Sequence, residues 1–386
     1  MAKTVAQINE KIRRGKVVVV TAEEFSQMAT TADIETLAEQ VDVVTTATFG
    51  PMCSSSAVIN FGHWSPGIRM EEITLNGVHA YEGLAAVDTL IGATAESKFD
   101  PTYGGANVIE DLIAGKDVRL FARGKGTDCY PTREIDTWVN KDGLNEFYLF
   151  NPRNAYQNYA AATNSTNKIK YTYMGTLLPK FSNVTYSTSG ELSPLLNDPY
   201  LRTIGLGTRI FLGGSEGYVV WNGTQYNTSR ERNEHGIPLG TGATLALIGD
   251  AKQMSTEFIR SAYYEKYGVS LFVGIGIPIP VLDVRMAKHL SIRNSQIETF
   301  ISDYGQDGHP TVSRVTYEEL QSGKVRLPNG REAKSAPLSS LSKAREIAKL
   351  LQTWIERGEF TLTEAVHPFP AKSFVKPLVP REGGSR

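Results

Sequence analysis

The sequence predicts an α/β fold: a mixed sheet with flanking helices and a strand-rich, Gly-rich middle region at about 150–250. Apolar residues recur at spacings of three and four over residues 1–40 and 341–355, which indicates helices at both ends of the chain. In the middle region, short apolar runs alternate with turns of Gly, Asn, Ser and Thr, a pattern typical of strands. The periodicities alone fit an all-parallel sheet about equally well.

Each of the two cysteines follows a predicted strand. A β-branched run over 41–47 predicts a strand, and the loop after it holds Cys53. Alternating apolar residues over 118–122 predict another strand, and the Gly-punctuated loop over 123–131 holds Cys129. Since ligands bind at the carboxyl ends of strands in α/β sheets, the two thiols could meet there.

The remaining elements follow from apolar periodicity and from stop signals. The expected set is a short strand over 16–20, a helix over 108–113 capped by Asn107, strands over 209–212, 218–221 and 269–273, and helices over 254–267 and 341–355. The last of these strands leads into a Gly- and Pro-rich segment, 274–280. No repeat or linker divides the chain, so we expect one domain over 1–367 and a mobile Pro-rich tail over 368–386.

Composition excludes several classes of protein. With 386 residues, 41% of them hydrophobic, the chain can bury a large core and is not disordered. The 40 basic and 41 acidic residues give a net charge of −1 without long blocks of one sign, which argues against nucleic-acid and membrane-surface binding. The longest apolar stretch, 273–282, is too short to cross a membrane, and 17–20 is too short for a signal-peptide core. We therefore expect a cytoplasmic protein.

The thiols are the leading candidates for chemistry. Two cysteines are too few for a disulfide scaffold or a four-thiolate metal site in one chain, and the six histidines lack metal-ligand spacing, so we expect no bound metal. Three serines after Cys53 could open a helix whose amides favour a thiolate, and Cys129 has basic neighbours. The competing interpretation is that each cysteine is a small buried hydrophobe.

A hydroxyl-rich run and two arginines are candidates for substrate binding. The run 186–194 includes Ser187, Ser189 and Glu191, and offers amides and hydroxyls to a carboxylate; the alternative is a helix cap in which Glu191 closes a capping box. Arg209 and Arg232 could clamp an anionic substrate or pair with nearby acids.

Long ordered strings carry a resemblance to a known family. The strings are Thr48-Phe49-Gly50-Pro51-Met52-Cys53-Ser54-Ser55, Gly126-Thr127-Asp128-Cys129-Tyr130-Pro131, the run 186–197, and the segments 202–214 and 268–280. They resemble the homocysteine biosynthesis family, the L-aspartate semialdehyde sulfurtransferases of anaerobes, over nearly the whole chain.

The resemblance implies a reaction and its participants. Homocysteine would form from aspartate 4-semialdehyde, a sulfide-level sulfur donor and two electrons, with Cys129 carrying sulfur as a persulfide or thiolate and Cys53 assisting. Relatives are often fused to, or encoded beside, a ferredoxin-bearing protein. We therefore expect a separate reduced iron–sulfur protein of the ferredoxin type as the electron donor, and no cofactor bound by this chain alone. A homo-oligomer, and an iron–sulfur cluster between subunits, stay open.

Two thiols fit this reaction. Condensing an aldehyde with sulfide gives a thioaldehyde, which needs two electrons to become a thiol, and closure of a Cys53–Cys129 disulfide supplies two. That closure requires β-carbons about 3.5 to 4.5 Å apart; a persulfide relay does not require the disulfide. The alternatives are a general persulfide carrier with another acceptor and a non-catalytic metabolite-binding subunit.

The carboxylate and the ammonium group of the expected substrate also require binding residues. We expect Arg209 or Arg232 to bind the carboxylate, Ser187 and Ser189 to contact oxygen atoms, and Glu191 to bind the ammonium group.

Overall fold

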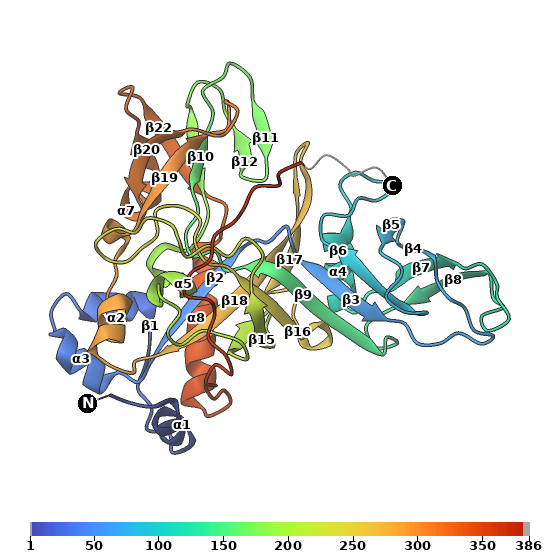
Figure 1. Ribbon diagram of the computed structural model, residues 1–386, viewed down its shortest axis with the longest axis horizontal. Coiled ribbons are helices and arrows are strands. Elements are labelled where there is room, and N and C mark those ends of the chain that lie inside the picture. The colour runs from blue at the N-terminus through green and yellow to red at the C-terminus, as the bar shows by residue number, and fades with distance from the viewer. Residues whose placement is uncertain (1, 381–386) are drawn as a thin grey trace.

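The computed structural model describes residues 2–380 and confirms the α/β class, with helices packed against mixed sheets (Figure 1). The central sheet has ten strands in the order β1-β2-β18-β14-β15-β16-β9-β3-β6, and β17 pairs with β18. β1 and β2 are parallel, whereas the other neighbouring strands of this sheet pair antiparallel. The strands are β1 (Val19–Thr21), β2 (Val43–Pro51), β3 (Ser56–Asn60), β6 (Asp88–Gly92), β9 (Glu146–Asn154), β14 (Arg209–Leu212), β15 (Ser215–Asn222), β16 (Leu245–Asp250), β17 (Ile259–Tyr264) and β18 (Gly268–Pro280).

The segment 274–280 continues strand β18 despite its glycines and prolines. β18 pairs with β2 along its length, and helix α8 (Leu341–Glu356) covers the pair. A Cβ at Gly274 would lie 2.9 Å from the Ile347 side chain, so the glycine lets α8 approach. β14 pairs only with the residues up to Gly276, so both prolines beyond it avoid a second neighbouring strand. The sequence predicted this strand to end at residue 273, which is wrong.

The helix predicted over 254–267 is also wrong, because residues 259–264 form strand β17. β17 and β18 make a hairpin in which Ile259 faces Val273 and Tyr264 faces Gly268. Helix α4 (Gly105–Ile113) packs on this hairpin, and the Glu110 carboxylate accepts a hydrogen bond from the Ser261 N–H at 2.7 Å. Pairing with β18 therefore overrides the local helical spacing.

A second sheet of six strands has its own hydrophobic core. Its order is β20-β19-β10-β13-β22-β21. The strands are β10 (Ala161–Thr163), β13 (Asn183–Tyr186), β19 (Glu298–Asp303), β20 (Thr311–Thr316), β21 (Lys324–Arg326) and β22 (Glu332–Pro337). A separate hairpin of β11 (Lys170–Thr172) and β12 (Gly175–Leu177) projects beside it (Figure 1).

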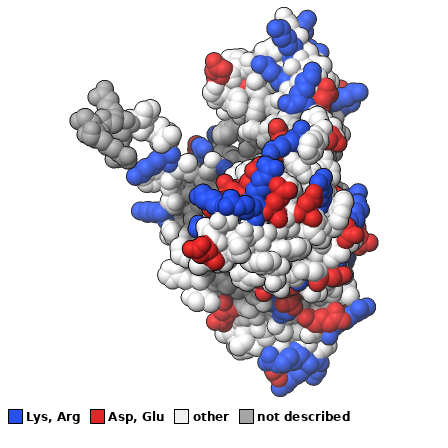
Figure 2. Space-filling view, turned by 90° about the vertical axis from the view of Figure 1, so that its right-hand side faces the viewer, with Lys and Arg blue, Asp and Glu red and all other residues white. Residues whose placement is uncertain are grey.

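A third sheet, in the order β5-β4-β7-β8, lies at the right-hand end of the molecule in Figure 1. The strands are β4 (Glu72–Leu75), β5 (Val78–Ala80), β7 (Val118–Arg123) and β8 (Glu134–Val139). Acidic and basic side chains are intermixed on this side of the molecule (Figure 2), and Arg119 pairs with Asp136 at 2.5 Å. One hydrophobic core runs through both this sheet and the central sheet, with α4 between them.

The expected helices at both ends of the chain are confirmed. The helices besides α4 and α8 are α1 (Val5–Arg13), α2 (Ala22–Met28), α3 (Ile34–Gln40), α5 (Pro194–Asn197), α6 (Val284–Leu290) and α7 (Tyr317–Gln321). Thr4, Thr21 and Asp33 cap the first three through side-chain hydrogen bonds.

Within residues 2–380, no helix has the length and apolar character needed to cross a membrane. The first part of the predicted tail lies against the body of the protein, where the Ser373 N–H donates to Thr228 Oγ1 at 2.9 Å. Residues 381–386 of that tail lie outside the described part of the chain.

Candidate active site

Cys53 lies on a tight turn between β2 and β3. The turn closes when the Ser55 N–H donates to the Met52 carbonyl at 3.0 Å. Ser54 Oγ donates to the Arg153 carbonyl and Ser55 Oγ accepts from the Asn151 amide, so both serines tie the turn to β9. The helix expected after Cys53 is therefore wrong: the chain enters β3 instead, and strand pairing rather than a helix terminus positions the thiol.

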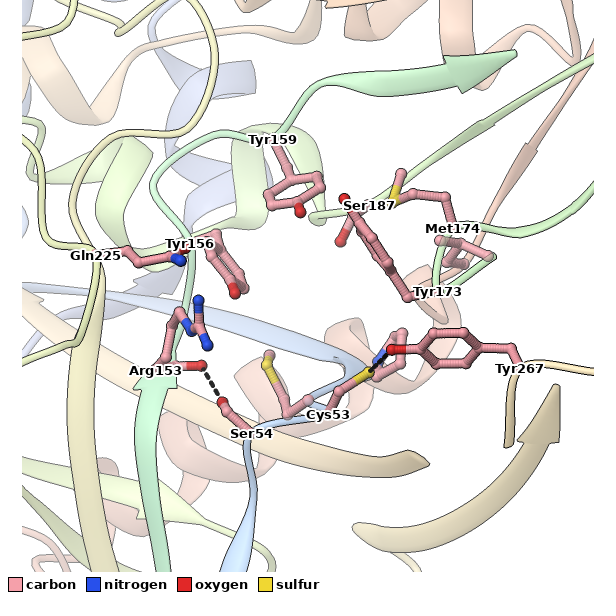
Figure 3. A pocket seen from close by; sticks show the side chains of 13 residues that line it. Cys53, Ser54, Arg153, Tyr156, Tyr159, Tyr173, Met174, Ser187, Gln225 and Tyr267 are labelled. Carbon is pink, nitrogen blue, oxygen red and sulfur yellow. Dashed lines mark hydrogen bonds between the residues drawn. The ribbon is translucent and has the colours of Figure 1, made fainter. Parts of the chain in front are cut away.

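The thiol opens into a cavity of about 340 Å³, which is large enough for a small metabolite (Figure 3). Its walls come from separate parts of the chain: the Cys53 turn, the end of β9, the β11–β12 hairpin and the β17–β18 turn. The lining side chains with polar groups are Cys53, Ser54, Arg153, Tyr156, Tyr159, Tyr173, Ser187, Gln225 and Tyr267. The cavity therefore forms only when the turn after β2 and the end of β9 in the central sheet meet the β11–β12 hairpin and the β17–β18 turn.

Two hydroxyl groups contact the Cys53 sulfur. Ser270 Oγ lies 3.2 Å from Sγ, and the Tyr267 hydroxyl donates to Sγ at 3.9 Å. Burial raises the pKa of Tyr267 above its ordinary value, and the nearby Cys53 sulfur raises it further. The Tyr267 hydroxyl therefore keeps its proton at neutral pH and can donate a hydrogen bond to a reacting sulfur or oxygen.

Four tyrosines give the cavity aromatic walls. The rings of Tyr156 and Tyr159 meet edge to face with centroids 4.9 Å apart, and those of Tyr173 and Tyr267 lie 6.1 Å apart. Burial raises the pKa of both Tyr156 and Tyr159, so these hydroxyls are neutral hydrogen-bonding groups. The walls therefore combine apolar ring faces with protonated donors.

Arg153 is the one basic side chain that lines this cavity in the described chain. Its guanidinium extends toward Tyr156 (Figure 3), and within residues 2–380 it has no ion pair and no hydrogen-bond acceptor. The Nε atom is buried without a partner. The sequence gives no sign of this residue's position, because an arginine near the end of a strand is unremarkable until β9 is known to pair with β3 beside Cys53.

The two predicted carboxylate-binding arginines have other partners and do not line the cavity. Arg209 pairs with Glu216, donates to Thr361 Oγ1 at 3.1 Å and stacks 4.4 Å from the Phe360 ring centre. Arg232 donates to the carbonyls of Pro199 and Gly236. Arg209 links β14 to β15 and to the segment after α8, and Arg232 joins two loops, so neither guanidinium is placed to bind a substrate in the Cys53 cavity.

Of the predicted hydroxyl-rich run, only Ser187 faces the cavity with Cys53. Ser189 is buried, and its N–H donates to Ser193 Oγ at 2.8 Å. Glu191 closes no capping box; its carboxylate accepts from the Asn294 N–H at 3.1 Å, and burial raises its pKa. Glu191 lines a different hollow with Asn294, so it is not placed to bind an ammonium group beside Cys53.

Cys129 is exposed on the loop between β7 and β8, as the sequence predicted for its place after a strand. Its loop packs on the segment after β3, where Thr132 Oγ1 donates to the Pro66 carbonyl at 2.8 Å. Cys53 precedes β3, and five strand residues span roughly 16 Å. Both thiols are free. Cys53 lies at a turn of the central sheet and Cys129 at a turn of the third sheet, so the two thiols do not meet at one sheet edge as predicted.

A metal centre is a separate question from the thiol site. Residues 2–380 contain no cluster of three or more His, Cys, Asp or Glu side chains that could hold a metal ion. A half-buried thiol in contact with two hydroxyl groups, facing a polar cavity with an unpaired arginine, is the arrangement typical of an enzyme that acts on a small metabolite.

Comparison with known proteins gives the family. Residues 17–362 match the family described as "Homocysteine biosynthesis enzyme, sulfur-incorporation", and the chain belongs to this family. It is 49% identical to a Methanocaldococcus jannaschii protein over 94% of this chain and 72% of that protein, and 46% identical to a Methanosarcina acetivorans protein over 97% and 74%. Both relatives are named L-aspartate semialdehyde sulfurtransferase. No solved structure matches the chain. The chain is thus a sulfurtransferase of homocysteine biosynthesis. This confirms the predicted family and enzyme class, and it argues against the alternative of a non-catalytic metabolite-binding subunit.

Proposed function

We propose that this chain forms L-homocysteine from L-aspartate 4-semialdehyde, a sulfide-level sulfur donor and two electrons, in the Cys53 cavity. The observation that carries the proposal is the joint presence of a thiol that lines the cavity, of hydroxyl groups in contact with that thiol, and of an arginine in the same cavity without a counter-ion. These groups match an aldehyde that carries a carboxylate. A cytoplasmic location is part of the same proposal.

The reaction balances in two steps. Sulfide adds to the aldehyde carbon and water leaves, which converts the C=O bond into a C=S bond. Two electrons and two protons then reduce the thioaldehyde to the thiol. Cys53 and Cys129 supply both electrons and protons as they join in a disulfide, and a separate ferredoxin-type protein returns two electrons to reopen it.

The position of Cys129 in the third sheet favours a disulfide between two copies of the chain. The third sheet shares one continuous core with the central sheet, and a Cβ at Gly105 of α4 would lie 1.8 Å from the Gly92 carbonyl oxygen. Such close packing opposes a swing of the third sheet toward the Cys53 cavity of its own chain. We therefore propose a homo-oligomer in which the exposed β7–β8 loop brings Cys129 to the cavity of a second copy.

The test is an anaerobic assay of pre-reduced protein with aspartate semialdehyde, sulfide and a low-potential reductant. Homocysteine, read by mass spectrometry, is expected from the native chain, and a loss of at least about 100-fold is expected for both Cys53→Ser and Cys129→Ser. Activity in the Cys53→Ser variant at the native level would remove this cavity from the reaction.

A general persulfide carrier is the second candidate, and the exposure of Cys129 favours it. That function needs Cys129 alone. It predicts that Cys53→Ser still transfers sulfur from a persulfide to dithiothreitol or another thiol acceptor, whereas the homocysteine-forming enzyme loses its product in both cysteine variants.

A further inference from the structure

We propose that Arg153 and the tyrosine walls form an amino-acid subsite in this cavity, in which the guanidinium binds the α-carboxylate and the ring faces bind the ammonium group. The identity of the amino acid as aspartate semialdehyde rests on the proposed function. The subsite itself rests on the unpaired Arg153 and on the chemistry of the cavity walls.

Arg153 is held by its backbone and left free at its side chain. Its N–H donates to Asn151 Oδ1 at 3.3 Å and its carbonyl accepts from Ser54 Oγ at 3.0 Å. The guanidinium then extends into the cavity with a buried Nε that has no acceptor. A partly buried guanidinium whose Nε lacks an acceptor is unfavourable, whereas a carboxylate would accept two parallel hydrogen bonds from it.

The rest of the cavity fits the ammonium end of the same ligand. No carboxylate lines the cavity in the described chain, and Glu191 lies elsewhere. The ring faces of the four tyrosines attract a cation, and the Gln225 and Ser187 side chains offer oxygen atoms that can accept hydrogen bonds from an ammonium group. A zwitterionic amino acid is thus matched by one charged group for its anion and by neutral aromatic walls for its cation.

The subsite also directs the reactive end of the ligand. Ser54, the neighbour of Cys53, contacts the Arg153 backbone, so the guanidinium and the thiol reach the same cavity from adjacent strands (Figure 3). In aspartate semialdehyde three carbon–carbon bonds separate the carboxylate carbon from the aldehyde carbon. A carboxylate on Arg153 therefore leaves the aldehyde free to face Cys53 rather than the tyrosine walls.

The test compares two alkylating reagents that differ in one charge. Iodoacetate carries a carboxylate and iodoacetamide is neutral, and peptide mass spectrometry reads both rates at Cys53 and at the exposed Cys129 of the same molecules. Normalised to Cys129, the iodoacetate-to-iodoacetamide rate ratio at Cys53 should fall at least about fivefold in Arg153→Gln and less in Arg153→Lys. An unchanged ratio in a folded Arg153→Gln protein would overturn the proposal.

A second measurement needs no variant. L-2-aminobutyrate, which lacks the aldehyde, should slow iodoacetamide labelling of Cys53 in the native chain, and its amide, L-2-aminobutyramide, should protect at least about fivefold more weakly. Equal protection by both compounds would contradict carboxylate binding by Arg153. Neither measurement involves turnover, so a native chain that makes no homocysteine but passes both tests would refute the proposed function and leave the subsite standing.

Discussion

Arg209 and Arg153 carry the same charge but make different contacts, and this contrast can be measured. Arg209→Ala removes an ion pair, hydrogen bonds to Thr361 and stacking on Phe360, so we expect the free energy of unfolding to fall by about 2 to 3 kcal/mol. The KM for the semialdehyde should stay unchanged. Arg153→Ala should give the reverse: a KM raised about tenfold or more, with stability nearly unaffected.

Urea denaturation and steady-state kinetics on both variants check this prediction. A raised KM in Arg209→Ala at native stability would return that residue to the substrate site.

The sequence identified Cys53 because its motif and its place after a strand are local properties. It proposed Ser187 from the hydroxyl-rich composition of the run 186–194, and this side chain lines the cavity. Arg153 could not be found in this way. Its significance comes from the absence of a partner, and a missing contact becomes visible only when the surrounding side chains are placed.

At the scale of elements, the α4 helix depends on its first residue. A Cβ at Gly105 would lie 1.8 Å from the Gly92 carbonyl oxygen, so Gly105→Ala forces α4 away from the central sheet. We expect a loss of about 3 kcal/mol in the free energy of unfolding, although alanine is the better helix former. Gly143→Ala, where the nearest atom lies 3.7 Å away, is the matched control and should be nearly neutral.

Thermal and urea unfolding of both glycine variants provide the measurement. Equal stability of the two would mean that α4 can shift without cost and that the third sheet is not firmly packed.

An ion pair between Asp283 and Arg202 joins helix α6 to the segment after α5, and its contribution to stability depends on pH. Asp283 caps α6 through the Met286 N–H, and hydrogen bonds from Arg202 lower the pKa of Asp283 to about 2. A carboxylate with a lowered pKa stabilises the fold above its unfolded pKa of about 4, and this contribution is lost as pH falls toward 2. Asp283→Asn keeps the cap but loses the ion pair, so it should cost about 1 kcal/mol at pH 7.

Urea midpoints measured from pH 7 to pH 3 test this pair, and the difference between native and Asp283→Asn proteins should begin to narrow below about pH 4. A difference that grows as the pH falls would contradict the sign of the pKa shift. Arg202→Gln, combined with Asp283→Asn in a double-mutant cycle, isolates the interaction from the cap.

Element types were predictable where the periodicity was long, as in α8, and ambiguous where it was short. Residues 259–264 place Ile259, Ala262 and Tyr263 at helical spacing, yet the six-residue run pairs with β18. The Gly- and Pro-rich segment 274–280 has the composition of a loop, but its strand is sustained by β2 on one side and by α8 packing on its glycines. Both errors arise from partners distant in the sequence.

At the scale of the whole molecule, the separation of the two thiols depends on strand order. The sequence predicted both post-strand loops, but not that β3 lies between Cys53 and the segment on which the Cys129 loop packs. The third sheet also carries exposed aromatic side chains, at the end of the β7–β8 pair opposite the Cys129 loop: Phe99, which packs on Gly77, is 83% exposed, and Trp138, which pairs with Arg119, is 64% exposed. Large exposed rings are typical of interaction sites, so the third sheet, which also bears the exposed Cys129 loop, suits contact with a second copy.

Mixing of inactive variants tests whether the two thiols act between copies. In a symmetric dimer with reciprocal sites, an equal mixture of Cys53→Ser and Cys129→Ser chains forms about half mixed dimers, each with one complete site, so about a quarter of native activity should return. Catalysis within one chain predicts no recovery of activity.

The control is an equal mixture of the native chain and the double variant. If the sites lie between copies, about a quarter of native activity should remain, because only dimers of two native chains have complete sites. If each site lies within one chain, about half should remain. No recovery in the first mixture together with half activity in the second would show that Cys129 reaches Cys53 of its own chain, and hence that the third sheet moves.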